Sequence, residues 1–221
     1  MEPKSNRASL WVVTFRRLVT AALLACAAVT VLAVGADGAV VESHASKCTI
    51  TGTTHRDVLY GTNGNDVICA RGGNDVIFAR GGADVLRGGA GSDFLHPGWG
   101  YDVARGGRGT DSVGYTGHHN PMLVNLRRKV ALGMGADALR GIEGAVGGRF
   151  GDTLIGDSRA NVLDGRGGDD ILKGLGGDDS LIGWVGDDRL DGGPGHDQLD
   201  GGKGTDVCRQ GLGLGSETAC P

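Results

Sequence analysis

The chain has 221 residues, of which 44 are glycine, and aromatic residues make up only 5%. Its 22 Lys and Arg residues against 26 Asp and Glu residues give a formal net charge of −4. This acidic balance lacks the basic face that nucleic-acid binding requires, so we expect no nucleic-acid partner. With so few aromatic residues the chain is poorly equipped to fold by hydrophobic burial alone, and another source of stability is needed.

The first 45 residues are predicted to be a secretory signal peptide. Two arginines precede an apolar run at residues 18–34, which small residues end, and this order is typical of export signals. Cleavage fits after Ala36 or after Ala45. Two alternatives stay open: an uncleaved membrane anchor, for which the run is near the lower length limit, and lipoprotein processing at Cys26. We expect a secreted, extracellular protein with no stable membrane association after cleavage.

Two blocks of nine-residue repeats follow, within residues 46–114 and 147–221, and each block holds seven units in phase. The fourth place of a unit is glycine in 11 of the 14 units, the exceptions being His55, Phe150 and Arg159. The sixth place is aspartate in 13 units and Asn161 in the other. These aspartates are the candidate metal ligands: Asp57, Asp66, Asp75, Asp84, Asp93, Asp102, Asp111, Asp152, Asp170, Asp179, Asp188, Asp197 and Asp206.

Each unit has the pattern of a tight loop followed by a short strand. Glycine permits positive φ, so that a six-residue loop can curl and point its carbonyl groups inward. The triplet after the aspartate, such as Val76-Ile77-Phe78, favours a strand whose central side chain points into the core. Two units then make one turn of a coil, in which two thin sheets enclose aliphatic rows. The pattern predicts an all-β solenoid.

This coil stacks aspartates that lie 18 residues apart, such as Asp66 and Asp84, at a spacing of about 4.8 Å. Two unit charges at that distance repel each other by about 1 kcal/mol in water and by a few kcal/mol near a protein surface. Carbonyl and carboxylate oxygens are hard ligands that suit calcium. We therefore predict calcium ions between the turns, and a coil that is unstable without them.

The units GGAGSDFLH, GGPGHDQLD and GGKGTDVCR resemble the GGxGxDxUx repeats of RTX (hemolysin-type) calcium-binding proteins, in which U is a large apolar residue. The resemblance implies a parallel β-roll, a right-handed β-solenoid, in which each loop shares calcium with the loop two units later. Five inter-loop sites per block, or roughly ten calcium ions in all, are then possible. The three units without the fourth glycine are the poorest candidates. RTX proteins often leave the cell through a dedicated exporter that reads a C-terminal signal; with its N-terminal signal, the chain looks more like the small exported calcium-binding proteins of actinobacteria.

Residues 115–146 break the nine-residue phase. Strand-like runs lie at 122–126 and 129–132, and a Gly-Ile-Glu segment follows at 141–143. This arrangement is similar to the spacer between RTX roll segments, so we expect an irregular β spacer that joins or caps two rolls. His118-His119 could suggest a metal site, but we favour an exposed polar turn.

Four cysteines lie outside the predicted signal peptide. Cys48 and Cys69 flank the start of the first block, and Cys208 and Cys220 flank the end of the second. Pairing each cysteine with its neighbour would staple both ends of the solenoid, where fraying begins. The sequence leaves the two other connectivities open.

The leading hypothesis is a secreted calcium-binding protein that folds on binding calcium. The sequence lacks the HExxH and GxSxG motifs, so we predict no catalytic residues, no enzyme activity and no cofactor besides calcium. The alternative is a calcium-dependent adhesion or carbohydrate-binding module, whose partner is a cell-surface or extracellular glycan stacked on Trp99, Tyr101 or Trp184. A secreted hydrolase or epimerase with an unrecognised site is the last alternative.

Overall fold

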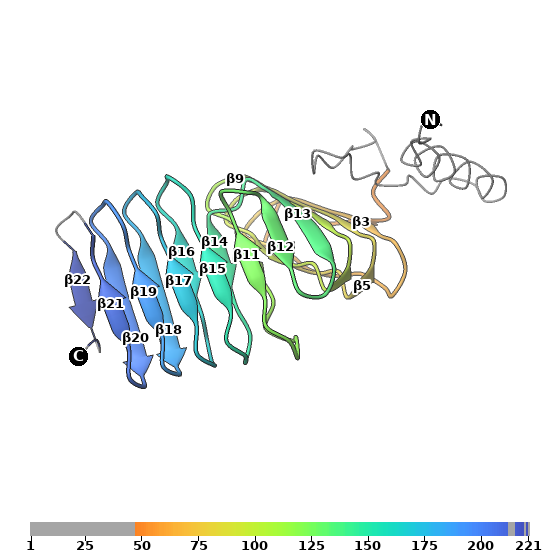
Figure 1. The fold of residues 1–221 in the computed structure, drawn as a ribbon. Coiled ribbons are helices and arrows are strands. Elements are labelled where there is room, and N and C mark those ends of the chain that lie inside the picture. Colours follow the sequence, from red (N-terminus) through yellow and green to blue (C-terminus); the bar gives the residue numbers. More distant parts are fainter. Residues whose placement is uncertain (1–46, 212–214, 219, 221) are drawn as a thin grey trace, which may run out of the picture. The chain divides into compact units, whose positions relative to one another are not determined.

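The computed structural model describes residues 47–211, 215–218 and 220, so the predicted signal peptide lies outside the described residues. Every regular element among the described residues is a β-strand. Among the described residues, no helix is long and apolar enough to cross a membrane. The strands alternate between two sheets as the chain coils, and most neighbouring strands are parallel (Figure 1). The predicted all-β parallel β-roll is confirmed.

Eleven strands of the described residues form one sheet, which we call the long sheet. In their order across the sheet they are β1 (Ile50–Thr51), β3 (Val67–Gly72), β6 (Val85–Ala90), β9 (Val103–Arg108), β13 (Ala136–Arg140), β12 (Val130–Leu132), β11 (Leu123–Asn125), β15 (Thr153–Ile155), β17 (Ile171–Lys173), β19 (Arg189–Asp191) and β21 (Val207–Arg209).

Nine strands form the opposite sheet, which we call the short sheet. They are, in order, β2 (Val58–Tyr60), β4 (Val76–Phe78), β7 (Phe94–His96), β10 (Ser112–Gly114), β14 (Gly144–Val146), β16 (Val162–Asp164), β18 (Ser180–Val185), β20 (Gln198–Lys203) and β22 (Ser216–Thr218). A small third sheet pairs β5 (Gly81–Gly82) with β8 (Trp99–Gly100).

The register of the parallel pairs sets the length of a turn. Ile68 lies opposite Leu86 in the first block, and Leu172 lies opposite Leu190 in the second. Both pairs are 18 residues apart, so one turn takes two nine-residue units, as predicted. Because neighbouring strands lie about 4.8 Å apart, each sixth-place residue meets its counterpart one turn later.

The core is a double row of aliphatic side chains, one row from each sheet. The central residue of each triplet points inward, and it is almost completely buried in all turns but the outermost, as at Ile77, Leu95, Leu163 and Leu181. Leu59 and Cys208, in the outermost turns, are partly buried. Ala104, the smallest side chain at this place, is also fully buried. Two thin rows bury little apolar area for each turn, so the loops between the sheets must supply much of the stability.

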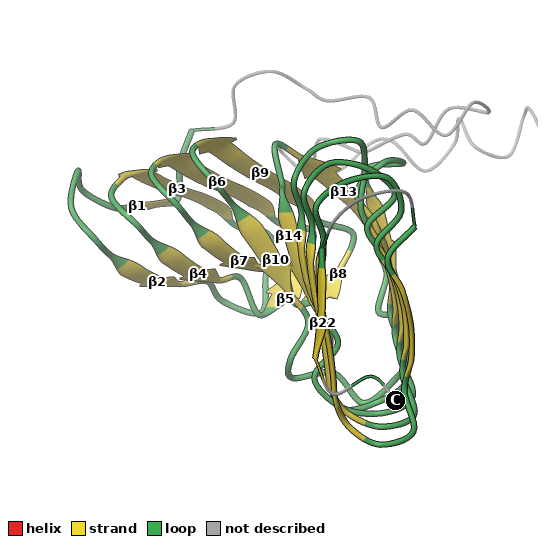
Figure 2. Cartoon of the chain, turned by 90° about the vertical axis from the view of Figure 1, so that its left-hand side faces the viewer, coloured by secondary structure: helices red, strands yellow, loops and turns green. Residues whose placement is uncertain are grey.

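The spacer joins the two blocks by continuing both sheets. The short sheet has only β14 between β10 and β16, whereas the long sheet has β13, β12 and β11 between β9 and β15. The strand β12 is antiparallel to both of its neighbours. Two extra strands lengthen one side of the stack by about 10 Å. The strands of the two blocks accordingly run at different angles (Figure 2).

Two disulfide bonds close the ends of the roll. Cys48 is bonded to Cys69, which lies in β3, and Cys208 in β21 is bonded to Cys220. Each bond therefore links neighbouring cysteines, which was one of the three connectivities that the sequence left open.

Candidate metal centre

The sixth-place residues lie directly before the strands and form one column for each sheet. All of them except the partly exposed Asp57 are buried. The long-sheet column contains Asp66, Asp84, Asp102, Asp152, Asp170, Asp188 and Asp206, and the short-sheet column contains Asp57, Asp75, Asp93, Asp111, Asn161, Asp179 and Asp197.

One oxygen of each stacked carboxylate is held by the backbone of the preceding turn. The N–H of Asp66 donates to Oδ1 of Asp84 at 2.7 Å, and the N–H of Asp170 donates to Oδ1 of Asp188 at 2.8 Å. The same bond recurs along both columns. Carboxylates are thus fixed one above another at the spacing of neighbouring strands, where they repel each other.

The second carboxylate oxygen, Oδ2, divides the loops into two groups. In ten loops it is buried and has no hydrogen-bond donor among the described residues. We call these the uncapped loops, and their aspartates are Asp75, Asp84, Asp93, Asp102, Asp111, Asp170, Asp179, Asp188, Asp197 and Asp206. A buried charged oxygen without a partner costs several kcal/mol, on the order of 3 or more. These ten oxygens therefore need a cation or a proton.

In the other four loops of the two blocks, the backbone of the loop itself supplies the donor. We call these the self-capped loops, and they are the first two loops of each block. The second-place N–H groups of Thr53, Thr62, Gly148 and Asp157 donate at 2.6–2.7 Å to the inner oxygens of Asp57, Asp66, Asp152 and Asn161, respectively. The hydroxyl groups of the two threonines donate to the same oxygens.

Backbone conformation separates the same two groups. In the uncapped loops the second and fourth places both have positive φ, even where the second place carries a side chain, as at Arg80 (75°) and Leu175 (80°). In the self-capped loops of the described chain, neither place has positive φ. Three of these four loops belong to the units without the fourth-place glycine, which the sequence singled out as the poorest calcium candidates. The loop of Asp66 was missed because it keeps glycine at the fourth place, Gly64. The sequence feature that distinguishes this loop is Thr62 at the second place.

Oxygens from consecutive turns converge on the space beside the first-place glycines. A Cβ added at Gly174 would fall against Oδ2 of Asp179 and against the carbonyl oxygen of Gly192, one turn later. No group of three His, Cys, Asp or Glu side chains converges to hold a metal in the described part of the chain. A bound ion would therefore take most of its ligands from backbone carbonyls. This donor set of carboxylate and carbonyl oxygens fits calcium.

Burial raises the pKa of many column carboxylates. It raises the pKa of Asp170 to about 8, with the neighbouring Asp152 and Asp188 charges contributing, and that of Asp102 to about 8, with the Asp137 charge contributing. The pKa of Asp179 rises to about 7 for the same reasons. Without a counter-ion, these carboxylates hold protons into the neutral pH range.

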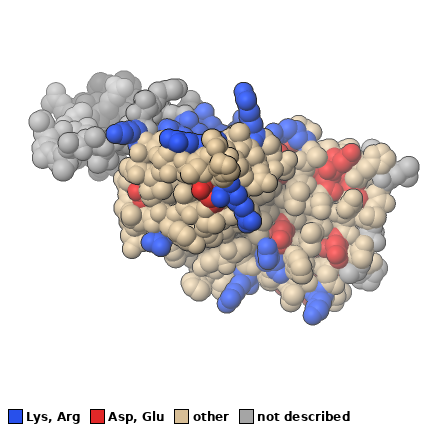
Figure 3. All heavy atoms as spheres, turned by 180° about the vertical axis from the view of Figure 1, so that it is seen from behind, with Lys and Arg blue, Asp and Glu red and all other residues tan. Residues whose placement is uncertain are grey.

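The second block carries additional carboxylates that the sequence reasoning did not single out. Asp169, Asp178 and Asp187 are exposed at the fifth places of three successive units. The backbone N–H of Asp187 donates to Asp169 at 3.0 Å, and that of His196 donates to Asp178 at 2.9 Å, so fifth-place residues one turn apart also stack along the roll. On the face shown in Figure 3, Asp and Glu side chains gather over the second-block half. The second block therefore has the higher density of negative charge.

Two carboxylates of the spacer continue the columns. The N–H of Asp102 donates to Oδ1 of Asp137, and the N–H of Asp111 donates to Oε2 of Glu143, both at 3.1 Å. Neither residue was among the predicted ligands, because the steps of 35 and 32 residues leave the nine-residue phase. Only the pairing of β13 with β9 and of β14 with β10 reveals them.

The histidine pair of the spacer does not form a simple exposed turn. His119 is exposed, but His118 is buried against the rings of Tyr115 and Trp99, with ring centroids 5.6 and 5.8 Å away. The expectation of an exposed turn was wrong for His118, because the spacer folds back onto the roll instead of projecting from it.

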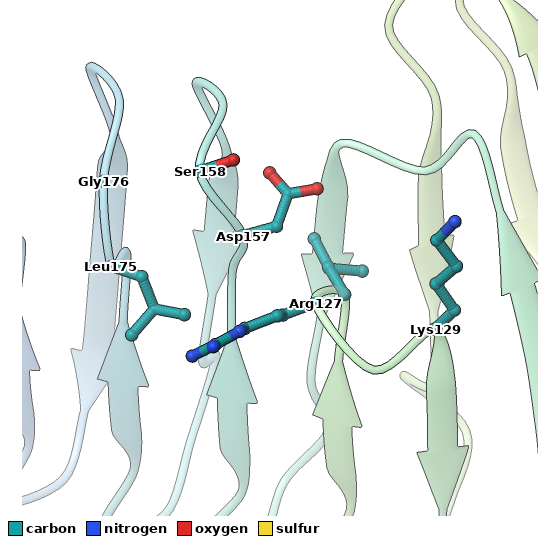
Figure 4. Close-up of a pocket in the computed structure, with 7 residues that line it drawn as sticks. Arg127, Lys129, Asp157, Ser158, Leu175 and Gly176 are labelled. Carbon is teal, nitrogen blue, oxygen red and sulfur yellow. The ribbon is translucent and has the colours of Figure 1, made fainter.

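A depression of about 520 Å³ lies beside the junction of spacer and second block. Arg127 and Lys129 line it from the spacer, Asp157 and Ser158 from a self-capped loop, and Leu175 from the next turn. In Figure 4 the Arg127 side chain extends toward Leu175, whereas Lys129 points away on the opposite side. The two cations do not converge on one anion, and the depression is separate from the inner oxygens of the columns.

Comparison with protein families gives one match. A family model described as RTX calcium-binding nonapeptide repeat (4 copies) matches residues 49–77, 70–104, 78–113, 146–181 and 173–208. These segments cover both blocks, and together more than half of the chain. Comparison with curated proteins gave no match.

Proposed function

The chain belongs to the family of RTX calcium-binding nonapeptide repeat proteins, and from this premise we propose that it is a secreted protein that folds on binding calcium. The observation that carries the proposal is the set of ten buried Oδ2 atoms without a donor among the described residues. Calcium would supply positive charge between the stacked carboxylates and replace their lost hydration.

The uncapped loops are the proposed binding positions. Each would offer the Oδ2 of its aspartate together with carbonyl oxygens of its own loop and of the loop one turn later. Five such loops lie in each block, so the proposal is for up to about ten ions. The self-capped loops of Asp57, Asp66 and Asp152 are left out, because a backbone N–H already occupies the inner oxygen.

Secretion is supported by the export-signal pattern of residues 1–45 and by the two disulfide bonds. Disulfides persist in oxidising compartments outside the cytosol. Extracellular calcium modules bind with dissociation constants of roughly 10⁻⁴ to 10⁻³ M. Because calcium would bind only the folded chain, the folded fraction should follow the extracellular calcium concentration. The proposal assigns the aspartate columns a structural role and no catalytic one.

The test is far-UV circular dichroism of residues 46–221 during a calcium titration, with magnesium as the control ion. We expect a transition from coil to β structure with calcium and none with magnesium, because magnesium demands a stricter octahedral geometry and keeps its water. A chain that is fully folded in chelator, or that calcium leaves unchanged, would refute the proposal.

Glycan binding is the second candidate, and the exposure of three aromatic side chains favours it. Trp99, Tyr101 and Trp184 are 55%, 63% and 50% exposed, respectively. Exposed rings of this kind can stack on sugars. Binding to a glycan array that disappears in both Trp99→Ala and Trp184→Ala would support this function. Unchanged binding in both variants would exclude these rings as the site.

A further inference from the structure

The middle of the roll contains protein groups in the positions where the two blocks would need calcium. We propose that the central segment, defined as residues 115–164, stays folded without calcium and serves as the nucleus from which both blocks fold when calcium binds. This inference rests on the proposed function, since it concerns which part of a calcium-dependent fold does not depend on calcium.

Arg159 provides the first substitute, in the short-sheet column. Its guanidinium bonds Glu143 at 2.7 Å and Asp157 at 2.8 Å. Glu143 belongs to the turn before the Asn161 loop, so the guanidinium links two consecutive turns. Arg159 stands at the fourth place, where uncapped loops carry glycine, and Asn161 at the sixth place has lost the charge. One loop has thus replaced an external cation by an internal one.

Tyr115 provides the second substitute, in the long-sheet column. Its side chain is fully buried, and its hydroxyl donates to Oδ2 of Asp137 at 2.9 Å. Asp137 occupies the position that follows Asp102 in the column. A hydrogen bond from a protein hydroxyl therefore reaches the oxygen that in the uncapped loops has no donor among the described residues.

The two remaining column positions of the segment are satisfied by the backbone. Asp152 accepts hydrogen bonds from the N–H groups of Met122 at 2.7 Å and Gly148 at 2.6 Å. Asn161 accepts one from the N–H of Asp157 at 2.7 Å. No column oxygen of the segment is among the buried unpartnered atoms of the described residues. Removing calcium therefore leaves no unpaired column oxygen in this segment.

The segment also has the most favourable core for independent folding. It buries Tyr115, Met122, Leu126 and Ile142 in addition to the aliphatic rows that the blocks share. The strands β11, β12 and β13 are consecutive in the chain and pair antiparallel. Contacts between neighbouring segments cost less loop-closure entropy than the 18-residue pairings of the blocks.

Hydrogen exchange followed by mass spectrometry tests the inference on the full-length protein, with chelator and with saturating calcium. In chelator we expect peptides from 122–163 to exchange on the order of tenfold more slowly than peptides from 70–113 and 165–209. With calcium, all three regions should be protected. Equal, complete exchange of all regions in chelator would overturn the inference.

Arg159→Gln tests the internal cation, and Arg166→Gln is its matched control. The Arg166 guanidinium is also about half exposed and bonds Asp164 at 3.0 Å, but both residues belong to one turn. In chelator, Arg159→Gln should speed exchange of peptides from 143–163 by roughly tenfold, because it leaves two shielded carboxylates without their cation. Arg166→Gln should leave that exchange unchanged. Equal effects of the two variants would overturn the role of Arg159.

A second variant covers the case in which Arg159→Gln simply fails to fold. The triple variant Asp157→Gly/Arg159→Gly/Asn161→Asp gives the unit GGSGADVLD, which has the repeat pattern, so the loop should bind calcium instead of carrying its own cation. We expect peptides from 143–163 to lose protection in chelator and to regain it with calcium. Protection in chelator equal to that of the unmodified protein would contradict the inference.

The outcomes separate this inference from the proposed function. If the blocks exchange as slowly in chelator as with calcium, the proposed function fails. If calcium protects the blocks and the central segment is equally unprotected without it, the proposed function stands and the inference of a calcium-independent nucleus fails.

Discussion

At the scale of single residues, one oxygen decides the behaviour of each repeat. Oδ1 is bonded to the backbone along both columns, so it does not distinguish one loop from another. Oδ2 does: it is bonded to Thr62 in the loop of Asp66 and has no donor among the described residues in the loop of Asp170. The difference between a loop that needs a cation and one that does not is therefore a matter of one backbone N–H.

The raised carboxylate pKa values predict that acid stabilises the metal-free protein. The pKa values of Asp102 and Asp170, about 8, lie above the value of about 3.9 for an unfolded aspartate. Between these limits the folded chain binds more protons, so stability is greatest below about pH 4 and is lost as the pH rises to about 8. After removal of metal by dialysis, the content of β structure measured by circular dichroism should be higher at pH 5 than at pH 8.

With saturating calcium the order should reverse, because protons compete with calcium for the same carboxylates. The expected reversal is itself the control for a general effect of acid on the protein. A metal-free content of β structure that is independent of pH, or higher at pH 8, would contradict the assignment of protons to the columns.

Asp170→Asn and Asp57→Asn form a matched pair that tests the two loop states. Asp170 is uncapped, whereas Oδ2 of Asp57 accepts hydrogen bonds from Thr53. Isothermal titration calorimetry should show that Asp170→Asn lowers the number of bound calcium ions by about one, since an amide oxygen binds calcium less strongly than a carboxylate. Asp57→Asn should leave the number unchanged. Loss of a calcium ion in both variants would show that self-capping does not exclude the metal.

At the scale of the elements, the nine-residue unit combines a loop that can take two backbone conformations with a strand that has only one role. The strand packs its central side chain against the core whatever the loop does, as Leu59 and Leu163 follow self-capped loops and Leu86 follows an uncapped one. The loop changes with its second and fourth residues. Binding capacity can therefore vary from unit to unit while the register of the sheets stays constant.

Thr62→Gly should convert a self-capped loop into an uncapped one. The new unit, GGNGNDVIC, has the repeat pattern, and Asp66 would lose the hydroxyl donor that helps to hold its pKa below the usual value against the effect of burial. We expect about one additional calcium ion in calorimetry, and a metal-free protein that is about 1 kcal/mol less stable.

Thr54→Gly is the control for this substitution, because it makes the same change at an exposed third place. It should leave the number of bound ions unchanged. If Thr62→Gly also left that number unchanged, the second-place residue would not control the state of the loop.

At the scale of the whole molecule, a roll has two open ends and a joint, and each is secured differently. The joint is held by the hydrogen bonds and ion pairs of the central segment. The ends are held by covalent bonds, Cys48–Cys69 and Cys208–Cys220. The exposed fifth-place carboxylates of the second block, such as Asp178, add negative charge to that block. We therefore expect the second block to depend more strongly on calcium than the first.

Removal of the first disulfide should destabilise the N-terminal end. The bond closes a separation of 21 residues, for which the chain-entropy estimate is about 3 kcal/mol. The double variant Cys48→Ser/Cys69→Ser should lower the free energy of unfolding by about that amount in urea denaturation with saturating calcium. The unmodified protein under reducing conditions serves as the comparison. If the double variant were as stable as the oxidised unmodified protein, the bond would not hold this end.

The repeat by itself determined the fold, because a period of nine with one apolar residue in phase can bury that residue only in a coil of two units per turn. It also identified the 13 aspartates of the columns. It singled out three of the four self-capped loops as poor calcium candidates, because the amino-acid sequence shows that another residue, such as Phe150 or Arg159, replaces the fourth-place glycine. The choice among the three disulfide connectivities could not be made from the amino-acid sequence, because it depends on which turns are neighbours in the fold.

Only the tertiary structure decided which carboxylate oxygens lack a partner. Asp137, Glu143, Tyr115 and Arg159 lie outside the nine-residue phase or break its pattern. Asp137 and Glu143 meet the columns only because β13 and β14 pair with the last turn of the first block, and Arg159 reaches Glu143 because β16 pairs with β14. Periodicity reports contacts that recur at a fixed separation. Contacts across the spacer occur once each, at separations set by its folded path, and a repeat pattern contains no information about them.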